Sequence, residues 1–98
     1  MREREIEKWI RLRIESMGGK FMKLVSPGNN GMPDRIAVMP GGLAYFVELK
    51  TDDGRLSPIQ AWQIEQLKKR DARVFVVRGM AEARAFVGIL QDEQDGLL

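Results

Sequence analysis

Leu43-Ala44-Tyr45-Phe46-Val47-Glu48-Leu49-Lys50 is an eight-residue run whose length and apolar content predict a strand inside a β-sheet. Its two charged residues, Glu48 and Lys50, are two positions apart. Because residues i and i+2 of a strand point to the same face, a carboxylate and an amine are expected side by side. A buried charge is costly unless it is paired or binds a metal, so this pair calls for an explanation.

A second carboxylate, Asp34, follows Pro33 and precedes another strand-like run, residues 35–39. If the two strands pair, Asp34 approaches Glu48. Two clustered carboxylates suit a hard divalent ion such as Mg²⁺ or Mn²⁺, and Lys50 could then orient or deprotonate an attacking water. The alternative is a structural salt bridge between Glu48 and Lys50. The order and strand placement of the three residues favour metal-dependent phosphodiester chemistry only slightly over that alternative.

Glu7 is a further candidate for this site. It is expected on an N-terminal helix, at the edge of an apolar stripe that contains Ile10 and Ile14. From there its carboxylate could reach a site beside the sheet. The alternative is a surface glutamate paired with Arg11 at i+4. Glu3 projects in nearly the same direction and is a rival for the same role.

Gln60 has two interpretations that do not exclude each other. Ser57-Pro58-Ile59-Gln60 matches a capping box, in which the glutamine side chain bonds back to the backbone N–H of the N-cap serine. The closeness of Gln60 to Lys50 along the chain also allows it to hold water or a phosphate oxygen in the site. The sequence does not favour one role over the other.

The rest of the chain predicts the element order α-β-β-β-α-β-α in one domain, residues 1–90. Gly18-Gly19 and Pro58 mark helix boundaries. The acidic tail, residues 91–98, is expected to fray. The expected elements are a helix over 3–17, strands over 20–25, 35–39 and 43–50, a helix from 58 to about 70, a strand over 73–78 and a helix over 80–90.

The composition excludes several kinds of site. The chain has 98 residues with no cysteine and no histidine, so disulfides, thiolate zinc sites and histidine-based catalysis are ruled out. The lack of cysteine also favours an intracellular protein, and no membrane-spanning run or signal peptide is evident. Three of the 14 acidic residues lie in the tail, so residues 1–90 hold 16 basic and 11 acidic side chains, net +5. That excess is compatible with a polyanionic partner or with a mildly basic surface.

Several other residues have an ordinary structural explanation beside a possible functional one. Gly28 and Gly31 serve a turn, although they could also let a phosphate backbone approach. Trp9 and Trp62 are expected in the core or at an interface rather than as surfaces for base stacking. Three basic residues could contact phosphates, but exposed side chains are the default expectation: Lys23, Arg35 and Arg55.

Three stretches together resemble a known family. They are Gly31-Met32-Pro33-Asp34-Arg35, Phe46-Val47-Glu48-Leu49-Lys50 and Gly54-Arg55-Leu56-Ser57-Pro58-Ile59-Gln60. In this order they resemble the virus-type replication-repair nuclease (VRR-NUC) domain of the PD-(D/E)xK nuclease superfamily. Glu5-Ile6-Glu7 and the stretch from Lys23 to Gly28 fit as well, so the resemblance runs from about Glu3 to Val77.

The resemblance implies an α/β fold of the restriction-endonuclease type, with a mixed sheet flanked by helices. It implies that Asp34, Glu48 and the Leu49 carbonyl hold the metal, that Lys50 is the catalytic lysine, and that Glu7 and Gln60 complete the site. It also implies a homodimer acting on branched or four-way-junction DNA in replication, recombination or repair, in the cytoplasm of a bacterial or phage-infected cell. No organic cofactor is implied.

Two other functions remain open from the sequence. One is a non-catalytic DNA-binding module in which the acidic pair is structural. The other is an exonuclease or nickase that acts within a larger assembly.

Overall fold

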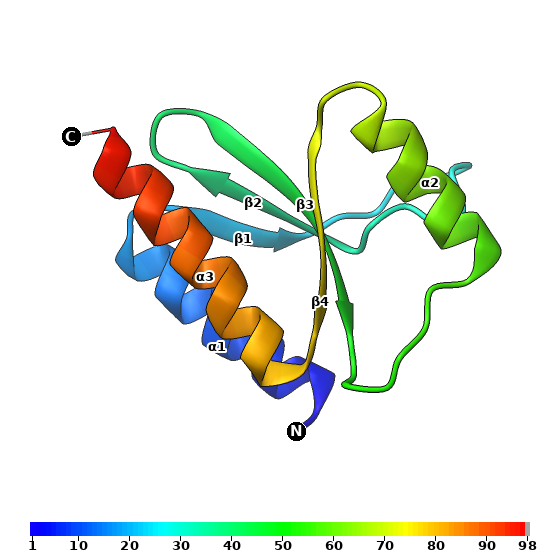
Figure 1. The fold of residues 1–98 in the computed structure, drawn as a ribbon, viewed down its shortest axis with the longest axis horizontal. Helices are drawn as coiled ribbons and strands as arrows, with labels where there is room; N and C mark the ends of the chain where they lie inside the picture. The colour runs from blue at the N-terminus through cyan, green and yellow to red at the C-terminus, as the bar shows by residue number, and fades with distance from the viewer. Residues whose placement is uncertain (98) are drawn as a thin grey trace.

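A computed structural model describes residues 1–97 of the chain, and Leu98 lies outside the described residues (Figure 1). The described elements follow the predicted order α-β-β-β-α-β-α. They are α1 (Glu3–Ser16), β1 (Lys20–Lys23), β2 (Arg35–Met39), β3 (Leu43–Lys50), α2 (Pro58–Lys68), β4 (Arg73–Arg78) and α3 (Gly79–Gly96). The predicted α/β class is confirmed, and most boundaries lie within two residues of those expected from the sequence.

The sheet has the order β1-β2-β3-β4. β1 pairs with β2 and β2 with β3 in antiparallel fashion, whereas β3 and β4 are parallel. The parallel pair requires a crossover connection, and α2 supplies it between β3 and β4. β3 therefore has a hydrogen-bonded neighbour on both sides, as its apolar run predicts.

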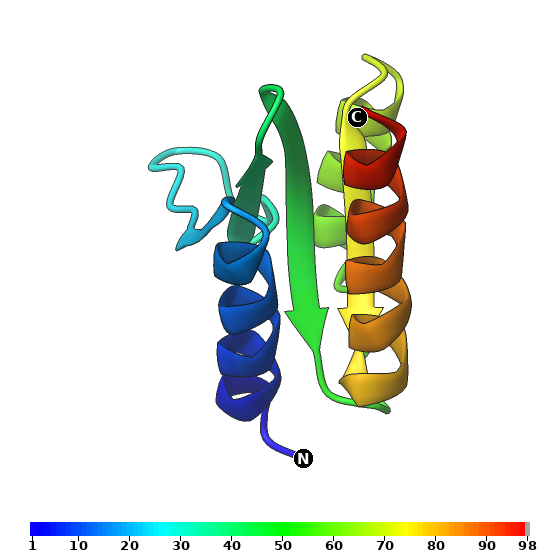
Figure 2. The same ribbon diagram turned by 90° about the vertical axis from the view of Figure 1, so that its left-hand side faces the viewer.

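The helices lie on both faces of this mixed sheet. In Figures 1 and 2, α1 and α3 lie side by side over one face, and α2 covers part of the opposite face. The stripe of α1 is buried, since Ile6, Ile10 and Ile14 are at most 1% exposed. It packs against buried residues of β3 and α3, among them Val47 and Phe86, to form the main core. α2 contributes one buried side chain of its own, Ile64.

The prediction for the C-terminal segment was wrong for residues 91–96. They continue α3 as a helix to Gly96 instead of fraying beyond residue 90. Two long-range contacts explain the extra turns. The Tyr45 hydroxyl on β3 donates a hydrogen bond of 2.5 Å to Glu93, and the Gln94 side-chain amide donates one of 2.9 Å to the Pro40 carbonyl. Burial and the Glu93 carboxylate raise the pKa of Tyr45 to about 12, so this donor stays protonated at neutral pH.

Within residues 1–97, none of the helices has the length and apolar character needed to cross a lipid bilayer.

The loop before β2 and the start of α2 meet at Gly31. Its φ is +84°, and a Cβ atom there would lie 2.9 Å from both the carbonyl carbon and the carbonyl oxygen of Ile59. Gly28, in the same loop, has a φ of +81° but nothing within 4 Å of a Cβ atom. The two glycines therefore share the same left-handed backbone conformation and differ in the space around them.

Gly31→Ala is expected to destabilise the chain more than Gly28→Ala does. Both variants place a side chain in the left-handed region, at a cost of about 1–2 kcal/mol. Gly31→Ala must also push the first turn of α2 away, which adds about 1–3 kcal/mol. Urea unfolding of the two variants measures the difference. Equal destabilisation would mean that the loop and α2 are not tightly coupled.

Candidate active site

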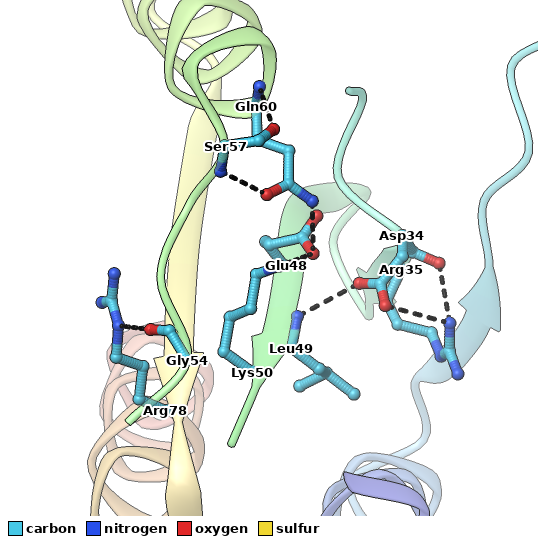
Figure 3. A network of polar contacts seen from close by, with 9 residues as sticks. All are labelled: Asp34, Arg35, Glu48, Leu49, Lys50, Gly54, Ser57, Gln60 and Arg78. Atoms are coloured by element: carbon cyan, nitrogen blue, oxygen red, sulfur yellow. Dashed lines mark hydrogen bonds and ion pairs between the residues drawn. The ribbon is translucent and has the colours of Figure 1, made fainter. Parts of the chain in front are cut away.

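β3 brings Glu48 and Lys50 together on the face of the sheet that α2 covers. The alternate residues Tyr45, Val47 and Leu49 point into the core beneath α1 and α3 and are at most 2% exposed. Glu48 and Lys50 therefore share the other face, as their spacing predicts. The Lys50 Nζ atom lies 3.7 Å from the Glu48 Oε2 atom (Figure 3). Glu48 is only 4% exposed, so its carboxylate is held largely out of water.

Pairing of β2 with β3 brings Asp34 to the same place. Arg35 is opposite Val47 in the antiparallel register, and Asp34 immediately precedes β2, so continuing the register by one residue places Asp34 opposite Glu48. The Asp34 Oδ1 atom accepts a hydrogen bond of 3.1 Å from the Leu49 backbone N–H. The approach of Asp34 to Glu48 that strand pairing predicts is thus present in the structure.

Gln60 forms the capping box predicted for it and also contacts Glu48. Its side-chain oxygen accepts a hydrogen bond of 2.9 Å from the Ser57 backbone N–H, and its own N–H donates one of 3.2 Å to the Ser57 hydroxyl. These bonds complete the capping box of α2. The other end of the amide, Nε2, donates a 3.3 Å hydrogen bond to Glu48 Oε2 (Figure 3). The cap therefore orients the amide toward Glu48.

The surroundings of Glu48 disfavour its charged form. Burial is the largest cause and the negative charge of Asp34 the second, and together they raise the pKa of Glu48 from 4.5 to about 7. Lys50 opposes this shift, and the negative charge of Glu3 on α1 adds to it. A cation between Asp34 and Glu48 would relieve both the burial cost and the repulsion.

Two carboxylates of α1, those of Glu7 and Glu3, are related to the site in different ways. Glu7 pairs with Arg11 at 3.5 Å, the surface pair considered as its alternative, and with Arg35 at 3.7 Å. Arg35 also lies 3.5 Å from the Asp34 carboxylate, so Glu7 is connected to Asp34 through a guanidinium group. Glu3 is the residue of α1 whose charge contributes to the raised pKa of Glu48.

The structure places the flanking basic residues differently from one another. Lys23 and Arg55 are exposed, which is their default expectation. The Arg35 side chain is 19% exposed and turned toward Asp34 and Glu7, and its buried Nε makes no hydrogen bond within the described residues. It is therefore placed to orient Asp34 more directly than to contact a phosphate.

Arg78 is a residue near the site that the sequence interpretation missed. It is opposite Lys50 in the parallel register of β3 and β4, and its Nε donates a hydrogen bond of 2.9 Å to the Gly54 carbonyl (Figure 3). This bond ties the loop before α2 to the sheet. The sequence did contain a signal for Arg78, because Arg78 is the last residue of β4 just as Lys50 is the last residue of β3.

The residues present fit a hard divalent cation. Asp34 and Glu48 supply carboxylate oxygens, the donors preferred by Mg²⁺ and Mn²⁺. Within residues 1–97 no group of three or more acidic, histidine or cysteine side chains has metal-binding spacing, so two carboxylates are the side-chain contribution. Mg²⁺ commonly binds through one or two carboxylates and keeps several waters, which is compatible with that number.

Comparison with known proteins identifies the family of the chain. The sequence model of the VRR-NUC domain matches residues 3–81. The chain is 40% identical over 60 residues to "Putative nuclease p44" of Acyrthosiphon pisum secondary endosymbiont phage 1, covering 61% of this chain and 64% of that protein. The match therefore spans less than two thirds of the length of that relative.

Two solved structures have the same fold. One, described as a VRR_NUC domain, superposes with a TM-score of 0.82 at 32% identity, covering 88% of this chain and 94% of that one. A second, a VRR_NUC domain protein, has a TM-score of 0.67 at 16% identity, covering 94% and 87%. With most of its length matched, this chain belongs to the VRR-NUC domain family.

The raised pKa of Glu48 predicts a pH-dependent stability. The folded chain holds this proton more tightly than the unfolded chain, so the free energy of unfolding falls as pH rises from about 4.5 to about 7. Glu48→Gln has no ionisable group at this position, so its free energy of unfolding should not show this fall. In metal-free buffer, the variant should gain about 2 kcal/mol relative to wild type between pH 5 and pH 8.

Urea unfolding at the two pH values measures this gain. Glu65→Gln, which removes a charge from an exposed position of α2, is the matched control and should change stability little at either pH. If the stability difference between Glu48→Gln and wild type did not depend on pH, that result would contradict the raised pKa of the buried Glu48 carboxylate.

Proposed function

We propose that this chain is a metal-dependent DNA nuclease whose active site is centred on Asp34, Glu48, Lys50 and Gln60. The observation that supports it most is the buried Glu48 carboxylate, which is 4% exposed, has its pKa raised to about 7 and faces Asp34. Such an arrangement is unfavourable in the metal-free chain and favourable once a divalent cation is bound. Membership in the VRR-NUC family agrees with this function.

Asp34 and Glu48 would hold the cation through side-chain oxygens, and the Leu49 backbone carbonyl is proposed as a third protein ligand. The Leu49 N–H already fixes Asp34 beside this backbone segment. A bound Mg²⁺ or Mn²⁺ would neutralise the scissile phosphate and lower the pKa of bound water. Arg35, at 3.5 Å from the Asp34 carboxylate, would hold that carboxylate in position.

Lys50 would act on the attacking water. Its Nζ atom is anchored 3.7 Å from Glu48, so it is placed next to the proposed cation site. From there the amine can orient the water for attack on phosphorus and stabilise the negative charge that develops on the phosphate oxygens. Gln60 holds Glu48 Oε2 at 3.3 Å and would keep that oxygen aimed at the cation.

Glu7 and Glu3 would complete the site from α1 in separate ways. Glu7 acts through Arg35, which it holds at 3.7 Å, and thereby positions Asp34. Glu3 adds negative potential at Glu48 and so increases the attraction for a cation.

The proposal extends to substrate and assembly. The sequence resemblance supports endonuclease activity on branched or four-way-junction DNA by a homodimer in the bacterial or phage-infected cytoplasm. A chain of 98 residues presents a small surface to a duplex, and a second copy would extend it. Two other functions would give different results in the assay below: a non-catalytic DNA-binding module would bind without cutting, and an exonuclease or nickase would distinguish linear from closed-circular DNA.

Lys50→Ala is expected to lower the rate of DNA cleavage by about 10²–10³-fold or more, because it removes the group that stabilises developing charge. The assay uses labelled single strand, duplex, flap, splayed arm, four-way junction and closed-circular DNA, each with Mg²⁺, Mn²⁺ or EDTA. Wild type should cut at least one substrate only when metal is present, and Glu48→Ala should not cut.

Lys69→Ala provides the matched control, since it removes the same charge from an exposed position just after α2. It should retain most of the wild-type rate. Cleavage by Lys50→Ala at the rate of Lys69→Ala would remove the lysine from the mechanism. Binding of DNA by wild type without cleavage in any metal would favour the non-catalytic module.

A further inference from the structure

A concave surface lies on α2, separate from the residues that surround Glu48. It is a cavity of about 240 Å³ between α2, the turn after it and the loop before β2. In Figure 1 that loop passes beside α2, on the side of the sheet away from α1 and α3. The cavity is lined by Asn29, Trp62, Gln63, Gln66, Leu67 and Arg70.

Trp62 is the feature of this cavity that most needs an explanation. It is 55% exposed, whereas the other six aromatic residues of the chain are buried or half-buried. The sequence interpretation expected both tryptophans in the core or at an interface. Trp9 does pack against the core, but Trp62 does not, so for Trp62 the core alternative was wrong. An indole ring left largely in water offers a flat apolar surface to a partner.

The polar side chains around Trp62 are held in place by the chain itself. Gln63 Nε2 donates a 3.0 Å hydrogen bond to the Asn30 carbonyl, which fixes the amide. Arg70 donates from one terminal nitrogen to the carbonyl and the side-chain oxygen of Gln66, at 2.9 and 3.3 Å. These contacts reduce the conformational entropy that a ligand would have to overcome.

The same contacts leave several groups available for a ligand. Among the described residues, the side-chain oxygen of Gln63 and the side-chain nitrogen of Gln66 have no hydrogen-bond partner. Arg70 forms no ion pair with any carboxylate in that part of the chain. The cavity therefore offers the face of the Trp62 ring, a free hydrogen-bond acceptor on Gln63 and a free donor on Gln66. It also offers the positive charge of Arg70, which no carboxylate in the described residues neutralises.

A nucleotide matches this combination. A planar base stacks on an aromatic side chain whatever its identity, its edge carries donors and acceptors that amides can pair with, and its phosphate can pair with a guanidinium group. A second copy of the chain is a poorer match, because the core of a homodimer interface is depleted of charged residues, and here a cation and three amides surround a single tryptophan.

The base must be unpaired, because bases within a duplex are already stacked on both faces. The position on α2 fits a strand that also reaches the proposed active site. Gln60, which contacts Glu48, and Gln63, which lines the cavity, are three residues apart and therefore lie on the same side of α2. The helix rises about 1.5 Å per residue, so Leu67, the last cavity residue within α2, is about 10 Å further along the axis than Gln60. That span corresponds to roughly three nucleotides of one strand.

On these grounds we infer that the Trp62 cavity binds an unpaired nucleotide of the DNA substrate, a few nucleotides from the phosphodiester bond that is cut. This inference rests on the proposed nuclease function and narrows the branched DNA proposed there to forms with a single-stranded segment next to the cleavage site, such as a flap. It assigns base stacking to Trp62, edge contacts to Gln63 and Gln66, and phosphate pairing to Arg70.

The test is a binding titration in EDTA with the full chain carrying Glu48→Gln, so that no cleavage occurs. The probes are an oligothymidylate single strand, a flap and a blunt duplex. Trp9→Phe in the same chain makes Trp62 the sole tryptophan, and stacking should quench its fluorescence. Affinities of all variants are measured from the anisotropy of labelled probes, because Trp62→Ala leaves no tryptophan to report binding. Trp62→Ala should weaken binding of the single strand and the flap by about tenfold, the loss typical of one stacked base. Blunt-duplex affinity should change much less.

Ile59→Ala is the matched control, since Ile59 is a 46% exposed apolar residue of α2 that does not line the cavity. It should bind all three probes as the parent does, and Trp62→Phe should restore most of the affinity lost in Trp62→Ala. Thermal melting confirms that each variant is folded.

Equal weakening of all three probes by Trp62→Ala, or no weakening, would overturn the inference. A change of oligomeric mass on Trp62→Ala, without loss of single-strand affinity, would also overturn it and assign the surface to a second copy of the chain. Because cleavage takes no part in this titration, its outcome is independent of whether the chain cuts DNA. Trp62-dependent binding with no cleavage in the earlier assay would refute the nuclease alone.

Discussion

A carboxylate held out of water at the end of a central strand is the constraint on which the candidate site depends. Glu48 is 4% exposed, with Asp34 opposite it, and its pKa is raised to about 7. Neither the Lys50 amine at 3.7 Å nor the Gln60 amide at 3.3 Å fully offsets this cost. Such a residue lowers the free energy of unfolding at neutral pH. This cost is common where a site must bind a cation tightly.

Three separate features of the fold bring partners to that carboxylate. The antiparallel register of β2 and β3 places Asp34 across from it, and the Leu49 N–H fixes the Asp34 side chain. The parallel crossover from β3 to β4 returns α2 over the same face, and the capping box directs Gln60 at Glu48. The loop before β2 packs closely against the start of α2 at Gly31, and the hydrogen bond from Gln63 to the Asn30 carbonyl joins the two segments. The capping box of α2 and the pairing of β2 with β3 thus both bring side chains next to the Glu48 carboxylate.

The parts of this structure that follow local rules could be predicted from the sequence. The two-residue spacing of Glu48 and Lys50 places them on one face of a strand, and Ser57 with Gln60 specifies the start of α2. The apolar run of β3 indicates a strand with neighbours on both sides. Each of these depends on residues close together in the chain, so one sequence contains the information.

The parts that depend on distant contacts could not be predicted in the same way. α3 extends to Gly96 because Glu93 contacts Tyr45, 48 positions away in sequence. Arg35 pairs with Glu7 of α1, 28 positions earlier in the chain, and nothing near Arg35 in the sequence indicates this. Trp62 is exposed because little of α2 is buried against the sheet. The sequence near Trp62 does not indicate this, so it left the choice between core and interface open.

The most direct test of this account is a calorimetric titration of the metal-free chain with Mn²⁺ at pH 8, for wild type, Asp34→Asn and Glu48→Gln. The account predicts that wild type binds Mn²⁺ and that each substitution weakens binding by about tenfold or more, since each removes a charged ligand of a two-carboxylate site. Wild-type affinity in both variants would show that the cation binds elsewhere. Absence of Mn²⁺ binding by wild type would contradict the metal site itself.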